Sequence, residues 1–243
     1  MKKLILSGIL LILLFACSQV KVPQGMPVEE KMRIGNEYFE NEKFNKAIPY
    51  YMEVVLDRNS RYTAEAQLKL ADCYFNQNKF LDARFEYEEM IRLFKNYEGI
   101  EEAYFKIGVC YFEQSLSPHY TQEETELALD AFNTFIEKFP LSELKTEAYD
   151  YIAKCELKLA TKKYYNGYAY YKLYDYSSAL MYFDEVLALN LDNEIDLKSL
   201  YYSARIYIRR KDKPMADLIR EKMNTKYPDA EETEKINRYI ENL

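Results

Sequence analysis

Glycine, proline and histidine are scarce in this chain of 243 residues, which has 6 glycines, 7 prolines and a single histidine. Glycine and proline are the residues that most often end helices and form turns, so their scarcity favours long helices over strands and tight turns. The one histidine, His119, lies in a polar stretch with no cysteine or carboxylate at metal-ligand spacing. We therefore expect no metal site and no cofactor, and we place His119 in solvent.

Motifs of the common nucleotide-binding and hydrolytic sites are also absent. The sequence has no G-x-x-x-x-G-K-S/T, G-x-G-x-x-G, C-x-x-C or G-x-S-x-G. Glu123, Glu124 and Glu126 begin an expected helix, where the helix dipole favours carboxylates. We therefore expect no catalytic residues and no enzymatic activity. The alternative is an envelope hydrolase that uses this acidic cluster.

Basic residues are in deficit, with 33 Lys and Arg against 40 Asp and Glu and a net charge of −7. Nucleic acids are bound largely by neutralisation of their phosphates, so an acidic chain has no general attraction for DNA or RNA. We exclude nucleic acid as a partner. Hydrophobic residues make up 49% of the chain, enough for the core of one large domain or two small ones.

The first residues have the features of an export signal. Two lysines precede an apolar run from Leu4 to Phe15, which is shorter than the roughly 20 residues needed to cross a bilayer. A basic start, a short apolar run and a small residue before the cut are typical of a signal peptide. We predict that residues 1–16 are such a signal.

The end of this signal, residues 14–17 (LFAC), resembles the lipobox of bacterial lipoproteins, although Phe15 departs from the small residue usual there. The resemblance implies that Cys17 is acylated, and Ser18 after it is similar to lipoproteins of the outer membrane. An ordinary signal peptide or an uncleaved anchor is the alternative. Residues 17–27 are polar and carry two prolines, so we predict a flexible lipidated tether.

Three segments, 34–54, 70–90 and 203–223, align without gaps. Each has a small residue, a tyrosine three later, an alanine nine after that and a large residue four further on. Two antiparallel helices that cross closely need small residues at the crossing and a large side chain beside it. The pattern resembles the tetratricopeptide repeat (TPR). Its residues are Gly35, Tyr38, Ala47 and Tyr51; Ala71, Tyr74, Ala83 and Tyr87; and Ala204, Tyr207, Ala216 and Arg220.

Five units begin at Val28, Ala64, Glu101, Ala160 and Leu197, at intervals of 36, 37, 59 and 37 residues. The long interval contains eight extra residues within 115–123 and a helical segment that continues into the fourth unit. We therefore expect one long helix over about 142–172. The predicted fold is an all-α, right-handed TPR superhelical solenoid of about five helix-turn-helix repeats, with a polar C-terminal capping helix. Residues 28–141 hold repeats 1–3, and 142–243 hold the long helix, repeats 4–5 and the cap.

Cysteines other than Cys17 are Cys73, Cys110 and Cys155. Cys73 and Cys110 hold the same place in successive repeats, and packed helices lie about 8–10 Å apart. That separation exceeds the Cα limit of about 7 Å for a disulfide. We predict three buried thiols.

The sequence combines a lipobox, five repeat units, a split third unit and a long helix. In this combination it resembles the BamD family, the lipoproteins of the outer-membrane β-barrel assembly machinery. The matching residues are Ala128, Phe132, Pro140 and Ser142 in the third unit and Tyr170, Tyr171, Tyr176, Ala179 and Phe183 in the fourth. The resemblance implies an outer-membrane protein, lipid-anchored and facing the periplasm. Its implied partners are the POTRA-bearing barrel subunit, other assembly lipoproteins and unfolded β-barrel precursors, with the membrane bound through the lipid. Another TPR lipoprotein scaffold, for pilus assembly or division, is the alternative.

By the same resemblance, the first helices of repeats 1–3 form a concave groove for a peptide with aromatic side chains, such as the C-terminus of a barrel precursor. Packing of the phenylalanines on the next repeat is the alternative. The groove residues are Met32, Asn36, Phe39, Leu68, Asp72, Phe75, Phe105 and Phe112.

Tyrosine and arginine gather in repeats 4 and 5. These residue types are enriched at interface hot spots, and a basic patch on an acidic protein suits an acidic partner. We predict that this face docks the barrel subunit; solvated charge over core tyrosines is the alternative. The extra loop is expected to be either a tolerated insertion or a contact. The docking residues are Tyr164, Tyr168, Tyr171, Tyr201, Arg205 and Arg209.

Overall fold

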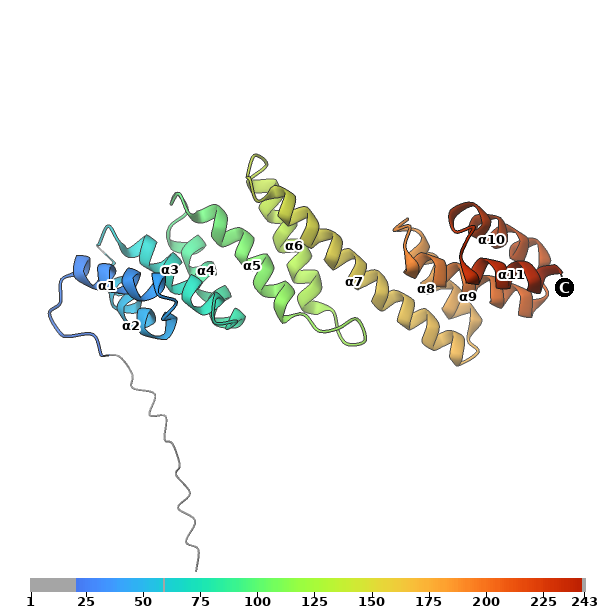
Figure 1. The fold of residues 1–243 in the computed structure, drawn as a ribbon, viewed down its shortest axis with the longest axis horizontal. Helices are drawn as coiled ribbons and strands as arrows, with labels where there is room; N and C mark the ends of the chain where they lie inside the picture. Colours follow the sequence, from blue (N-terminus) through green and yellow to red (C-terminus); the bar gives the residue numbers. More distant parts are fainter. Residues whose placement is uncertain (1–20, 59, 242–243) are drawn as a thin grey trace, which may run out of the picture.

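The computed structural model describes residues 21–58 and 60–241, and all regular elements within these ranges are helices. They form an elongated succession of helix pairs that runs from α1 at the left to α11 at the right, with α7 running obliquely between a larger first half and a smaller second half (Figure 1). The helices are α1 (Val28–Glu40), α2 (Phe44–Val55), α3 (Thr63–Phe75), α4 (Phe80–Leu93), α5 (Ile100–Gln114), α6 (Glu123–Lys138), α7 (Lys145–Lys172), α8 (Tyr176–Leu187), α9 (Glu194–Arg210), α10 (Lys213–Lys226) and α11 (Glu231–Glu241).

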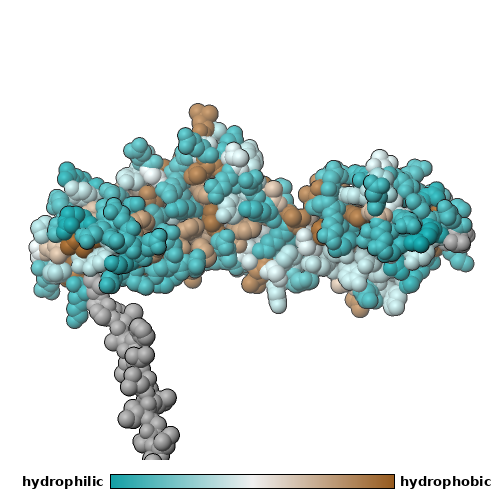
Figure 2. Space-filling view, viewed as in Figure 1, coloured by the Kyte–Doolittle hydropathy of each residue, from teal (hydrophilic) through white to brown (hydrophobic). Residues whose placement is uncertain are grey.

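Each helix packs on the next one along the chain, and α11 covers both α9 and α10. This arrangement confirms the prediction of an all-α TPR solenoid with a terminal helix. The visible face is largely hydrophilic, and the molecule narrows to a waist where α7 links the two halves (Figure 2). None of the helices within the described ranges combines the length and the apolar composition that a bilayer crossing requires.

The small and large residues of the repeat meet where the two helices of a pair cross. A Cβ atom added at Gly108 would lie only 2.7 Å from a ring carbon of Phe132. At the corresponding crossings, a Cβ on Gly35 or Gly167 would lie 2.8 Å from the ring of Tyr51 or Phe183. Glycine therefore lets the helices approach until a fully buried ring fills the gap.

The turns between the two helices of a pair are formed without glycine, which is consistent with the small number of glycines in the chain. In four of the five repeats the residue seven positions after the small one takes a left-handed conformation, although none of the four is glycine. In the third repeat the corresponding residue, Ser115, is extended (φ −69°, ψ 134°), and the inserted loop begins there. The four left-handed residues are Glu42, Asn78, Tyr174 and Lys211, with φ of 57°, 57°, 63° and 57°.

The inserted loop, residues 115–122, is fastened to α7. Lys158 Nζ donates hydrogen bonds to the backbone oxygen of Ser115 at 3.1 Å and to its Oγ at 2.5 Å. Lys162 Nζ donates to the backbone oxygen of His119 at 3.2 Å, and the exposed His119 ring stacks on Tyr165 with centroids 4.0 Å apart. The loop is thus fastened to the long helix by contacts within the chain.

The expected long helix is α7, which begins at Lys145, three residues after the predicted start. Cys73, Cys110 and Cys155 are buried and free, in agreement with the prediction of three thiols. Burial raises the pKa of Cys73 and Cys110 to about 12 and that of Cys155 to about 11. These thiols are therefore protonated at neutral pH and act as small apolar core residues.

Candidate functional site

Several residues of the predicted groove lie inside the helix pairs. Met32 and Leu68 are buried, and each belongs to a hydrophobic core cluster. Asn36 and Asp72 hold corresponding places in repeats 1 and 2, and each accepts a hydrogen bond from the tyrosine at the crossing. The oxygen–oxygen distance is 2.7 Å both from Tyr51 to Asn36 and from Tyr87 to Asp72. These polar side chains thus satisfy the hydroxyl groups of buried rings.

The predicted groove phenylalanines Phe39, Phe75 and Phe112 are each half-buried against neighbouring residues. Phe39 packs edge-on against Phe44 and Tyr51, Phe75 does the same with Phe80 and Tyr87, and Phe112 with Tyr151. A lysine ammonium from a following helix lies over each ring, at 4.4 Å for Phe39, 5.2 Å for Phe75 and 5.5 Å for Phe112. These three rings therefore help to hold successive repeats together.

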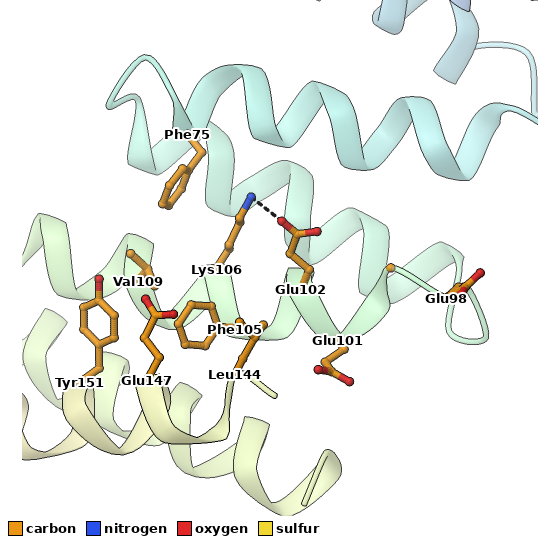
Figure 3. A pocket seen from close by; sticks show the side chains of 11 residues that line it. Phe75, Glu98, Glu101, Glu102, Phe105, Lys106, Val109, Leu144, Glu147 and Tyr151 are labelled. Atoms are coloured by element: carbon orange, nitrogen blue, oxygen red, sulfur yellow. Dashed lines mark ion pairs between the residues drawn. The ribbon is translucent and has the colours of Figure 1, made fainter. Parts of the chain in front are cut away.

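A cleft opens between α3, α5 and the start of α7, with a cavity volume of about 720 Å³ (Figure 3). Two predicted groove residues, Phe75 and Phe105, form part of its wall. Phe105 is itself buried and packs on Phe132, Phe135 and Tyr151. The cleft is lined by Phe75, Glu98, Gly99, Glu101, Glu102, Phe105, Lys106, Val109, Leu144, Glu147 and Tyr151.

The single cation in this lining is already paired. Lys106 Nζ lies 2.8 Å from Asp72 Oδ1 and 2.7 Å from Glu102 Oε1. Burial by itself lowers the pKa of Lys106, but the two carboxylates outweigh burial and raise the pKa above its ordinary value. Burial, together with Glu113 and Glu147, raises the pKa of Tyr151. The cleft is thus an aromatic pocket in an acidic environment.

The tyrosines of repeats 4 and 5 converge on one ring, Tyr202. Its centroid lies 6.4 Å from that of Tyr164, 5.0 Å from Tyr168 and 4.9 Å from Tyr171. Tyr164 is buried, whereas Tyr168 and Tyr171 are half-buried. Burial, followed by Tyr168, raises the pKa of Tyr202 to about 12.

Sequence reasoning had not selected Tyr202, because its position in the repeat is not one that faces the groove. The only signal was the doublet Tyr201–Tyr202 opposite a helix rich in tyrosine.

Arg205 and Arg209 of α9 extend this aromatic cluster to the surface. Arg205 Nη1 donates to the hydroxyl oxygen of Tyr201 at 3.4 Å, and its guanidinium carbon lies 6.0 Å from the centre of the Tyr171 ring. Arg209 Nη1 donates to the hydroxyl oxygen of Tyr176 at 2.7 Å, and this bond raises the pKa of Arg209. Within residues 21–58 and 60–241, neither arginine forms a salt bridge with a carboxylate. Two cations are thereby oriented by tyrosines without being neutralised.

The described residues contain no group of three or more His, Cys, Asp or Glu side chains placed to hold a metal ion. Cys17, the predicted acylation site, lies outside the described residues. Two surface features of the described residues are named by the residues that form them. We call the Phe75–Phe105–Tyr151 pocket the acidic cleft, and we call the surface of Tyr171, Tyr176, Tyr201, Arg205 and Arg209 the tyrosine–arginine face.

Five helix pairs with small-to-large crossings define the class of this protein as a TPR solenoid. A family model, YfiO, described as an outer membrane lipoprotein, matches residues 25–217. The chain therefore belongs to this outer membrane lipoprotein family, which is the BamD family.

Among individual proteins, the chain is similar to the outer membrane protein assembly factor BamD of Caulobacter vibrioides, with 26% identity over 147 residues. That match covers 60% of this chain and 48% of the relative, so it spans about half of the relative's length.

Two solved structures share the helical-repeat architecture. The TPR2AB domain of yeast Sti1, in complex with an HSP90 peptide, is 12% identical and has a TM-score of 0.47, covering 88% of this chain and 83% of that one. The MamA protein is 17% identical with a TM-score of 0.45, covering 84% and 96%. Because both TM-scores are below 0.5, we draw no conclusion from these structural similarities.

Proposed function

We propose that this chain is a non-enzymatic, lipid-anchored subunit of the machinery that assembles β-barrel proteins in the outer membrane. In this proposal Cys17 carries the lipid, and the solenoid faces the periplasm. Membership of an outer membrane lipoprotein family and likeness to a BamD assembly factor support it. A TPR solenoid whose described residues offer binding faces and no metal cluster suits a scaffold.

The observation that carries the proposal is the tyrosine–arginine face. Arg205 and Arg209 keep their full charge, and their guanidinium groups are oriented by Tyr201 and Tyr176. Rings that are already packed and cations that are already oriented lose little freedom on binding, which is the property of an interface hot spot. We assign to this face the docking of an acidic surface on the POTRA-bearing barrel subunit.

The first half supplies the second binding function. The phenylalanines of α1, α3 and α5 and the acidic cleft lie along the first helices of successive pairs, as a groove for an extended chain requires. We propose that unfolded β-barrel precursors bind here. The two activities then lie on opposite sides of the waist and can operate together.

Isolation of the native complex tests the proposal. The tagged full-length chain is extracted from its own membranes in mild detergent, and the proteins that accompany it are identified. We expect the POTRA-bearing barrel subunit and other assembly lipoproteins in near-stoichiometric amounts. Recovery of pilus or division proteins in their place would show that this chain serves another envelope machine.

A further inference from the structure

We infer that the acidic cleft binds an extended peptide in which an aromatic residue and a lysine or arginine stand two positions apart, and that it discriminates against a carboxylate in place of the cation. The inference rests on the proposed function and specifies the chemistry of the segment that the first half would receive.

The walls of the cleft define the aromatic part of the ligand. Phe75, Phe105, Val109, Leu144 and Tyr151 supply apolar surface from three different helices and the turn before α7. Ligand pockets in proteins usually have volumes of about 300 to 1,000 Å³. The cavity of about 720 Å³ therefore holds one or two large side chains but not a folded element. An aromatic ring gains both apolar burial and ring contacts against such walls.

The charges of the cleft define the rest of the ligand. Four glutamates line it against one lysine, Lys106, and the charge of Lys106 is taken up by Asp72 and Glu102. Glu101 accepts a hydrogen bond from Ser142. In the portion of the chain that the structure describes, Glu98 and Glu147 have no ion-pair partner. The cleft thus presents uncompensated negative charge beside an aromatic wall.

These charges oppose a ligand that carries a carboxylate. Capture of a peptide C-terminus requires a free cation, and the one cation in this lining is committed to two carboxylates. A metal ion is also a poor candidate, because no group of three or more potential ligands occurs in the described residues. A lysine or arginine side chain, in contrast, gains from the glutamates and from the ring faces.

The spacing of the ligand follows from strand geometry. Side chains two residues apart on an extended peptide point to the same side and are separated by roughly 6.5 to 7 Å. In the view of Figure 3, the carboxylate of Glu147 is seen between the rings of Tyr151 and Phe105. Glu147 lines the same cleft as both rings, so an aromatic side chain seated on the wall directs a cation two residues away toward the glutamates of the same cleft. β-Strand precursors, whose side chains alternate between two faces, offer such pairs.

Peptide binding to the full mature chain provides the test. Three fluorescent 12-residue peptides with amidated C-termini are compared by anisotropy, and they carry Phe-x-Lys, Phe-x-Glu or Ala-x-Lys at the centre of one common sequence. We expect the Phe-x-Lys peptide to bind at least about fivefold more tightly than either of the others, which is a modest free-energy difference for a charge at an interface rim. The preference for lysine over glutamate should shrink as salt is raised.

Variants of the protein then locate the selectivity. Glu98→Gln with Glu147→Gln removes the two unpaired charges without breaking an ion pair, and it should reduce the Lys-over-Glu preference to less than about twofold. The matched control, Glu137→Gln with Glu221→Gln, changes two exposed glutamates outside the cleft and should leave the preference intact.

The outcomes separate this inference from the proposed function. Equal or tighter binding of the Phe-x-Glu peptide, or failure of all three peptides to bind, would each overturn the inference. Copurification of the barrel subunit with the Glu98→Gln, Glu147→Gln variant reports on partner docking alone. If the barrel subunit does not copurify with the wild-type protein, the proposed function is refuted instead.

Discussion

At the scale of single residues, the fold depends on a few crossings where glycine faces a large ring. Gly35, Gly108 and Gly167 each leave no room for a methyl group against Tyr51, Phe132 and Phe183. Repeats 2 and 5 have alanine at the same place, Ala71 and Ala204. The separation of the helices in a pair is therefore set by the particular small and large residues that meet.

Replacement of Gly108 by alanine is predicted to destabilise the protein. Overpacking a tight contact costs about 1 to 3 kcal/mol, while the higher helix propensity of alanine returns about 1 kcal/mol. We expect a net loss of about 1 kcal/mol in the free energy of unfolding, measured by urea denaturation at constant m-value.

The control is a double-mutant cycle with Phe132→Leu, which relieves the clash. The double variant should be more stable than the sum of the two single effects predicts, because the two side chains touch. Strict additivity would show that the backbone, and not the ring, accommodates the added methyl group.

At the scale of elements, the loop of residues 115–122 fastens the third helix pair to α7. Burial lowers the pKa of Lys158, because its ammonium is held against the loop and the Phe112 ring instead of in water. The lysine thus exchanges hydration for hydrogen bonds to Ser115, and its contribution is to order the loop rather than to raise global stability.

Lys158→Met is therefore predicted to release the loop while the helices stay folded. Amide hydrogens of residues 116–122 should exchange at least about threefold faster, whereas the free energy of unfolding should change by less than about 1 kcal/mol. Hydrogen exchange with mass spectrometry measures the first quantity and urea denaturation the second.

Lys154→Met is the matched control for this change, since Lys154 lies on the same helix and packs over Tyr151 without touching the loop. Exchange in the loop should be as slow as in wild type. Unchanged exchange in the Lys158→Met variant would assign the order of the loop to Gln122, whose side chain donates to the backbone oxygens of Ser117, Tyr120 and Thr121.

The repeats and the long helix could be predicted because their signals are local. Small, aromatic and alanine positions recur at fixed spacing, and no glycine or proline interrupts residues 145–165. The left-handed turn residues could not be predicted, because Glu42 or Tyr174 gives no sign of positive φ. Left-handed non-glycine residues are held by the surrounding structure and not by their own preference.

The binding faces could be predicted only in part. The phenylalanine ladder and the tyrosine-rich helix are visible in the sequence, but the acidic cleft needs Glu147 and Tyr151 of α7 to stand opposite Phe75 of α3. That juxtaposition depends on how the split third repeat orients α7, which no spacing rule describes. The tyrosine cluster around Tyr202 could not be predicted from the sequence for the same reason, since the rings that contact Tyr202 belong to another helix pair.

At the scale of the whole molecule, the proposal places a lipid at Cys17 and two binding faces along one solenoid. Cys17→Ala should abolish acylation, because no other side chain can replace the thiol. After a high-salt wash that dissociates electrostatically bound partners, we expect the variant in the soluble periplasmic fraction and wild type in the outer membrane. Retention of the washed variant with the outer membrane would exclude the lipobox as the anchor.

The central claim is that the tyrosine–arginine face docks an acidic partner, and charge reversal of Arg205 and Arg209 tests it most directly. Arg209 is exposed and Arg205 is half-buried. Surface charges contribute about 0 to 1 kcal/mol to stability, so the double glutamate variant should stay folded. Like charges placed opposite each other across an interface cost several kcal/mol. Lys95→Glu with Lys138→Glu makes the same change of charge in the first half and serves as the control.

Copurification of the POTRA-bearing barrel subunit from detergent-solubilised membranes is the decisive measurement. The account predicts that Arg205→Glu with Arg209→Glu reduces the copurified subunit at least about tenfold, while the control pair and wild type retain it. Undiminished copurification by the folded, membrane-anchored double variant across a range of salt concentrations would contradict the account.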